Sequence, residues 1–304
     1  MFIYKGDKAD RKSREYTTWV RGLDRDFSTK WTQMLAQVQR SPEILEVMLR
    51  ILFHFVRYLK GNKASRAAGL VPLMKRIAAD TRLGSLPRQN VRRSIHPRLS
   101  CLRVLWELQK QVARTPSSTV EATDGVEKKS DEQRMDSIFG RDLCPLLYEL
   151  LETVTAVEID DLLGPLILEI YDRGGEPAVL RGELVRLALL HENGRTWGEN
   201  LLQFVNRRVH IREAASMLFE IIGTKQNVAS ATSSNHKEGG ALLSGRDYLY
   251  SNDAAVMVDV LLRERNRQPC LELLQLFLRL DLVPKKRTLI EQALAEDGVT
   301  SVKN

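Results

Sequence analysis

Apolar residues recur at the spacing of a helix face along most of the chain, and no segment shows the alternation typical of a strand. Leucine, glutamate, arginine and lysine dominate these segments, and short turns join most of them. The sequence therefore predicts an all-α protein of about a dozen helices. We expect helices after Ser28 and at about 41–60, 64–80, 98–114, 137–155, 158–172, 177–191, 196–207, 211–222, 248–265, 271–280 and 286–296.

Residues with known preferences for helix ends place several boundaries. Ser41 is a predicted N-cap and Pro42 fits the first helical position after it. Thr196 and Glu199 have the spacing of a capping box. Gly223 is a predicted C-cap and marks the end of the helix that begins near residue 211.

The helix that runs from Ile44 to Leu59 carries apolar residues on nearly every face. A helix of this kind has to be covered on more than one side. We therefore expect it to lie inside a stack of helices.

Paired apolar helices follow one another about every 40 residues, although no strict repeat motif is present. This pattern favours a right-handed superhelical array of the armadillo or HEAT type, with 1–304 as a single domain. Two polar segments, 115–134 and 224–247, predict disordered loops. The first is either a boundary between sub-blocks 28–114 and 137–296 or a surface insertion in one domain.

The formal net charge of +7 suits an acidic partner. The densest basic stretch contains Arg88, Arg92, Arg93 and Arg98, in a predicted segment between helices that has no aromatic residues for base stacking. A solvated basic loop explains this stretch better than a nucleic-acid site does, and nucleic-acid binding is the minority hypothesis.

Cys101, Cys144 and Cys270 lie far apart within apolar helices and lack CxxC spacing. This arrangement predicts buried thiols and argues against a disulfide framework or a zinc site.

The amino terminus becomes charged after four residues, unlike a signal peptide, and no apolar run is long enough to span a membrane. We expect a cytoplasmic protein without membrane insertion.

The short motifs of common enzyme classes are absent: GxxxxGK[ST], GxGxxG, HExxH and GxSxG do not occur. The five histidines are isolated from one another along the chain. We therefore expect no enzymatic activity, no cofactor, no bound metal and no small-molecule substrate. Helical arrays act mainly through extended surfaces, so binding to other proteins is the expected class of function.

Two segments take the prediction further. The segment YSNDAAVMVDVLLR resembles the signature of the SPIN/Ldb leucine-rich domain family, the armadillo-like core of the WISH/DIP/SPIN proteins. Upstream, ENLLQFVNRR and AASMLFEIIGT resemble two further blocks of that family in the same order, and the likeness covers about residues 190–300. The sequence departs from the family at Arg208, where the family has glycine, at Val209 and His210, and in its longer 224–247 segment.

The resemblance implies a non-enzymatic activator of the actin-related protein 2/3 complex. Such activators trigger nucleation of unbranched actin filaments without a preformed filament, and they meet actin only indirectly. Family members work in the cytoplasm at cortical actin structures such as endocytic patches, and they carry no cofactor. A general armadillo-like scaffold or adaptor for other proteins is the alternative, since it needs only the expected fold.

Residues within the matching segments are the candidates for contact with a protein partner. All except Tyr250 have a structural alternative. Asn252 or Asp253 is a predicted N-cap, and Asn206 and Arg207 are predicted to cap helix carbonyls. Asp259 and Arg263 have the spacing of an ion pair within one helix, and their position at the edge of the apolar face also suits a clamp between helices or a groove contact. The candidates are Asn206, Arg207, Tyr250, Asn252, Asp253, Asp259 and Arg263.

Overall fold

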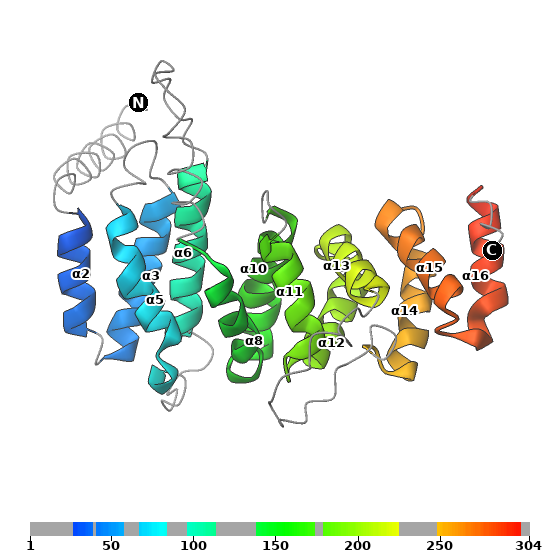
Figure 1. Cartoon of the computed structure of the whole chain (residues 1–304), viewed down its shortest axis with the longest axis horizontal. Helices are drawn as coiled ribbons and strands as arrows, with labels where there is room; N and C mark the ends of the chain where they lie inside the picture. The colour runs from blue at the N-terminus through cyan, green and yellow to red at the C-terminus, as the bar shows by residue number, and fades with distance from the viewer. Residues whose placement is uncertain are drawn as a thin grey trace, which may run out of the picture. The chain divides into compact units, whose positions relative to one another are not determined.

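A computed structural model describes residues 27–38, 41–57, 67–83, 96–113, 138–173, 179–224 and 248–298. Every regular element within these ranges is helical, and they contain no strand, which confirms the predicted all-α class (Figure 1). The chain divides into two compact units, one ending at Phe139 and the other beginning at Gly140. The predicted loops at 115–134 and 224–247 lie outside the described residues, apart from Thr224.

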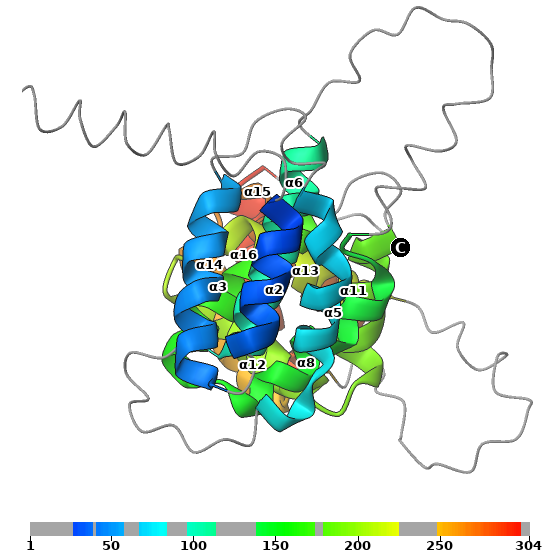
Figure 2. The ribbon, with the colours of Figure 1, turned by 90° about the vertical axis from the view of Figure 1, so that its left-hand side faces the viewer.

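The first unit is built around α6, Pro97–Ala113, which packs against both α3, Pro42–Arg57, and α5, Val71–Ala79. Helix α2, Phe27–Val38, packs on α3 and on the short helix η1, Ala68–Leu70 (Figure 2). A second short helix, η2, Thr81–Leu83, follows α5. Pro42 is the first residue of α3, as its sequence position predicts.

Helix α3 buries only one of its faces. Leu45 and Leu49 are fully buried, whereas Ile44, Val47 and Ile51 are 52%, 54% and 49% exposed. The expectation that this helix is covered on more than one side is therefore wrong. One apolar face is enough to hold a helix on its neighbours, and single aliphatic side chains at a protein surface are common.

The second unit contains the remaining helices, which follow one another from α8 to α16 (Figure 1). Contacts link α12 with α13 and α14, α13 with α15, and α15 with α16. The elements are η3 Arg141–Leu143, α8 Cys144–Thr153, α9 Ala156–Glu158, η4 Ile159–Leu163, α10 Gly164–Arg173, α11 Val179–Leu190, α12 Gly194–Asn206, α13 Ile211–Gly223, α14 Ser251–Arg263, α15 Gln268–Leu280, η7 Pro284–Lys286 and α16 Arg287–Glu296.

Helix η4 is one turn of π-helix between α9 and α10. At its end, Gly164 lies so close to Phe204 of α12 that a Cβ atom there would be 2.3 Å from the ring. Any side chain at 164 would therefore have to displace the Phe204 ring. The glycine leaves room for this ring beside the start of α10.

Tyr248 fixes the start of the α14 segment on α12. Its side chain is almost completely buried, and its hydroxyl donates a 2.8 Å hydrogen bond to the carbonyl oxygen of Gly194. A Cβ atom at Gly198 would lie 2.8 Å from the Tyr248 ring, so glycine leaves room for the aromatic side chain. This contact positions the segment that resembles the family signature against the helix that carries the other matching block.

The observed capping box is formed by Thr155 and Glu158 at the start of α9, where each side chain meets the other residue's backbone N–H. The one predicted at Thr196 and Glu199 is wrong, because α12 begins earlier, at Gly194. A Cβ atom at Gly194 would lie 2.0 Å from a carbonyl oxygen of α11. The tight turn between α11 and α12 therefore determines the start of α12, and the capping-box spacing of Thr196 and Glu199 does not.

The predicted C-cap at Gly223 is also wrong. Gly223 is the last residue of α13, and Thr224 follows it with an extended backbone. The Thr224 hydroxyl donates a 2.6 Å hydrogen bond to the Glu220 carbonyl oxygen. A side-chain hydroxyl therefore satisfies a carbonyl at the end of the helix. With a glycine C-cap, a backbone N–H would have been expected to do so.

The three cysteines are buried, as predicted. Burial raises the pKa of each thiol, to about 12 for Cys144 and about 11 for Cys270.

No helix in the described part of the chain is long and apolar enough to cross a membrane.

Candidate functional site

The carboxyl ends of α12 and α14 meet, and they bring together the two sequence segments that resemble the family. Arg263, the last residue of α14, donates to the Oδ1 atom of Asn206 at 3.0 Å and to its carbonyl oxygen at 3.3 Å. These residues lie 57 positions apart in the sequence. Two of the seven predicted candidates are therefore direct partners.

Glu264 is the centre of this contact, although no sequence signal singled it out. Its side chain is only 5% exposed, and its Oε1 atom lies 2.5 Å from Nε of Arg208 and 3.4 Å from Nε of Arg263. Its Oε2 atom lies 3.5 Å from Nε of Arg267. A buried carboxylate needs such partners to offset its desolvation. We call Asn206, Arg208, Arg263, Glu264 and Arg267 the Glu264 cluster.

The Glu264 cluster carries more positive charge than its carboxylate can balance. Three arginines (+3) share one glutamate (−1), which leaves a local charge of +2. The side chains of all three arginines are about half exposed. The cluster therefore presents cationic groups to solvent while its carboxylate remains inside.

Arg208 has a left-handed backbone conformation, with φ of 60°, as does His210 with φ of 50°. The Val209 N–H donates to the Phe204 carbonyl at 3.0 Å and closes the turn between α12 and α13. Left-handed φ costs a residue other than glycine about 1 kcal/mol or more. The sequence thus has arginine at a turn position that glycine would adopt with less strain.

Arg207 points to a different element. Its guanidinium pairs with Asp160 on η4, while its backbone N–H donates to the Gln203 carbonyl at 2.9 Å. The hydrogen bond that ends α12 thus comes from the backbone of Arg207. Arg207 is therefore the C-cap of α12, as predicted, whereas the side chain of Asn206 accepts a hydrogen bond from Arg263.

The predicted ion pair between Asp259 and Arg263 is wrong. Asp259 pairs instead with Nζ of Lys286 at 2.5 Å, and the same ammonium donates to the Ala255 carbonyl oxygen at 2.8 Å. Arg263 is held by Asn206 and by Glu264. Asp259 therefore links α14 to η7 and makes an interhelical contact.

At the other end of α14, Tyr250 occupies the N-cap position, and its side chain makes no capping hydrogen bond. The prediction of Asn252 or Asp253 as the N-cap is wrong, because both lie inside the first turn. Asp253 still favours the helix start through its charge. The half-exposed Tyr250 ring lies 4.9 Å from the guanidinium carbon of Arg195, a cation–π contact.

The seven candidates thus do not form one site. Asn206 and Arg263 belong to the Glu264 cluster, whereas Tyr250, Asn252 and Asp253 lie at the opposite end of α14. The two remaining candidates bridge to η4 and η7.

The basic stretch between 88 and 98 is only partly described. Arg88, Arg92 and Arg93 lie outside the described residues. Arg98 is buried, and its Nε donates to the Ala78 carbonyl oxygen at 2.7 Å. Its assignment to a solvated basic loop is therefore wrong, because the side chain joins α6 to α5.

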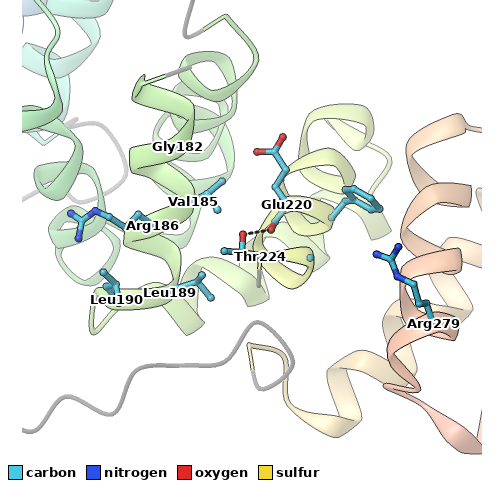
Figure 3. Close-up of a pocket in the computed structure, with 10 residues that line it drawn as sticks. Gly182, Val185, Arg186, Leu189, Leu190, Glu220, Thr224 and Arg279 are labelled. Carbon is cyan, nitrogen blue, oxygen red and sulfur yellow. Dashed lines mark hydrogen bonds between the residues drawn. The ribbon is translucent and has the colours of Figure 1, made fainter. Parts of the chain in front are cut away.

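A groove on the second unit was not predicted. It has a volume of about 550 Å³ and lies along α11 and α13, with Arg279 of α15 at its edge. Figure 3 shows Val185 and Leu189 on the side of α11 that faces α13, and Arg279 projecting from α15 toward α13. We call it the α11–α13 groove. Its residues come from three helices, so no short motif could reveal it.

Among the residues that the structure describes, no group of three or more His, Cys, Asp or Glu side chains could hold a metal ion. Comparison of the chain with family models, curated proteins and solved structures finds no significant match.

Proposed function

We propose that this protein is a non-enzymatic activator of the actin-related protein 2/3 complex, which starts unbranched actin filaments without a preformed filament. The contact of Arg263 with Asn206 carries the proposal. It joins two segments that resemble the SPIN/Ldb leucine-rich domain family. The left-handed backbone of Arg208, where that family has glycine, supports the same assignment.

An armadillo-like or HEAT-like superhelix is part of the proposal. Its support is the succession of packed helices in the second unit, such as α12 with α13 and α14 with α15. An array of this kind exposes a long surface for a protein partner. The exposed guanidinium groups of the Glu264 cluster suit an acidic patch on that partner.

The activator would work by differential affinity. If it binds the active arrangement of the complex more tightly than the inactive one, it shifts the population toward the active one. This mechanism needs neither a cofactor nor a bound metal on the activator. A location in the cytoplasm at cortical actin is part of the proposal, and a fluorescent fusion can test it.

A seed-free polymerisation assay tests the function. The purified protein is mixed with actin-related protein 2/3 complex and actin monomers, and we expect a shorter lag than with the complex alone. An unchanged lag with folded protein would contradict the proposal. Imaging of single filaments should show unbranched filaments in the first phase.

A charge reversal, Arg263→Glu, tests the assignment of the contact surface. We expect a longer lag than with the unmodified chain, and helicity measured in parallel should show that the variant is folded. Arg76→Glu, at an exposed position of α5 in the other unit, is the matched control and should leave the lag unchanged. Equal activity of both variants would remove the Glu264 cluster from the contact surface.

The general scaffold is the second candidate, and the α11–α13 groove favours it because such a groove fits many partners. Affinity capture distinguishes the two functions. Capture of other proteins without any subunit of the actin-related complex would favour the scaffold.

A further inference from the structure

The α11–α13 groove has an apolar floor and a charged rim. Val185 and Leu189 of α11 and Phe219 of α13 contribute apolar surface, while Arg186, Glu220 and Arg279 provide the charged groups around it. Apolar grooves of this size bind partner side chains, and the polar groups at their rims select among partners. The charges at the rim therefore indicate which partner fits.

Two of the rim charges are already balanced. Arg186 donates to both carboxylate oxygens of Glu183, at 2.9 Å and 2.6 Å, and this hydrogen bonding holds the pKa of Glu183 below its usual value. Glu220 pairs with Arg181, whose guanidinium also lies over the Tyr171 ring at 4.6 Å. Neither residue leaves an uncompensated charge at the groove.

Arg279 is the charge that remains. It is exposed, and it has no acidic partner within the described residues. On α15 the residues three and four positions before Arg279 are Gln275 and Leu276, and the helix ends at Leu280, so it supplies no carboxylate at this spacing either. The groove thus combines apolar surface with one available guanidinium group.

Gly182 leaves open space at the groove. It lies within α11, is exposed, and lines the groove, yet a Cβ atom there would meet nothing within 4 Å. Its φ is not in the left-handed region, so the backbone does not require glycine. Because glycine destabilises a helix relative to alanine, neither packing nor conformation explains it. Its effect is to leave the groove open.

We infer that the α11–α13 groove binds an acidic amphipathic segment of a partner protein. Large apolar side chains of that segment lie on Val185, Leu189 and Phe219, and a carboxylate beside them pairs with Arg279. This inference does not depend on the proposed function. It concerns the end of α13 that carries Glu220 and Gly223, whereas the Glu264 cluster lies at the end that begins with Ile211.

A displayed library of random peptides tests the inference with the full-length protein as bait. We expect enrichment of peptides with apolar residues at helical spacing and with Asp or Glu next to them. Synthetic peptides from the enriched pool then provide the probe, and fluorescence anisotropy gives their dissociation constants. Enrichment of basic peptides, or no enrichment at all, overturns the inference.

Two variants separate the apolar and the charged parts of the groove. Gly182→Trp places a large side chain in the open space and should weaken binding at least tenfold. Arg279→Glu should weaken the binding of the acidic peptides by a similar factor. It should strengthen the binding of peptides that carry Lys in place of Asp or Glu. A purely structural role of Arg279 would not produce this reversal of charge preference.

Arg76→Glu is the matched control, since it makes the same change of charge at an exposed arginine that does not line the groove. It should leave the dissociation constants unchanged. Peptides whose affinity survives both groove variants bind elsewhere, and that result would overturn the inference. The polymerisation lag is measured in a separate assay. A failure of the proposed function can therefore be distinguished from a failure of the proposed binding groove.

Discussion

The Glu264 cluster and the α11–α13 groove lie at opposite ends of α13 and differ in how far their charges are satisfied. In the cluster, three arginines share one buried glutamate, and Arg263 also binds Asn206. In the groove, Arg279 has no acidic partner among the described residues, and the surface beside it is apolar. The cluster joins the ends of α12 and α14, whereas the groove has the properties of a ligand-binding surface.

The comparison predicts a large loss of stability when the centre of the cluster is removed. Glu264→Ala leaves three arginines without their shared carboxylate and should lower the free energy of unfolding by about 2 kcal/mol, less than for a fully buried pair because the guanidinium groups are half exposed. Chemical denaturation followed by circular dichroism measures the effect. Glu264→Gln keeps the shape and should lose less. A loss below that of a surface substitution would mean that Glu264 does not organise the cluster.

The backbone of Arg208 offers a test that separates strain from charge. Arg208→Ala and Arg208→Gly both remove the ion pair with Glu264, but only glycine adopts a φ of 60° without strain. The glycine variant should therefore be about 1 kcal/mol more stable than the alanine variant. Equal denaturation midpoints would contradict a strained turn at this position.

Gly182→Ala should have the opposite effect on stability. Since a Cβ atom at 182 meets nothing, the substitution should raise the free energy of unfolding by about 0.5–1 kcal/mol. The matched control is Gly164→Ala, which should destabilise because its Cβ would lie 2.3 Å from Phe204. If both alanine variants lose stability, Gly182 has a structural role and the argument from the open groove weakens.

The smallest effect is expected at Asp259. Its side chain is 64% exposed, so the ion pair with Lys286 should contribute about 0.5 kcal/mol or less. A double-mutant cycle with Asp259→Asn and Lys286→Met isolates the interaction, and it should shrink in high salt. A coupling above about 1 kcal/mol at high salt would show that the contact is better shielded than its exposure indicates.

The helices could be predicted from the sequence because their signal is local. Apolar spacing placed α3, α6 and α13 within a few residues of their observed bounds. Helix ends were predicted less well, since neighbouring elements decide them. Helix α12 begins at Gly194, two residues before its predicted start, where a tight turn follows α11. Helix α14 begins three residues after its predicted start, beyond Tyr248, whose ring is held on α12.

The partners of charged side chains could not be predicted from sequence spacing. Asp259 and Arg263 have the spacing of an ion pair on one helix, yet each binds a residue from another helix. An exposed intrahelical pair is worth only a few tenths of a kcal/mol, so a nearby Lys286 or Glu264 readily replaces it. Glu264 itself is one of many glutamates in the chain, and its burial arises only when the chain folds.

The π-helical turn at Ile159–Leu163 has a consequence for how this unit tolerates changes of chain length. Such a turn holds one residue more than an α-helical turn, so deleting one residue there would leave an ordinary helix. Everything before the deletion would then rotate by about 100° relative to α10. Asp160 would turn away from Arg207, and the chain would keep its helix but lose its link to the end of α12.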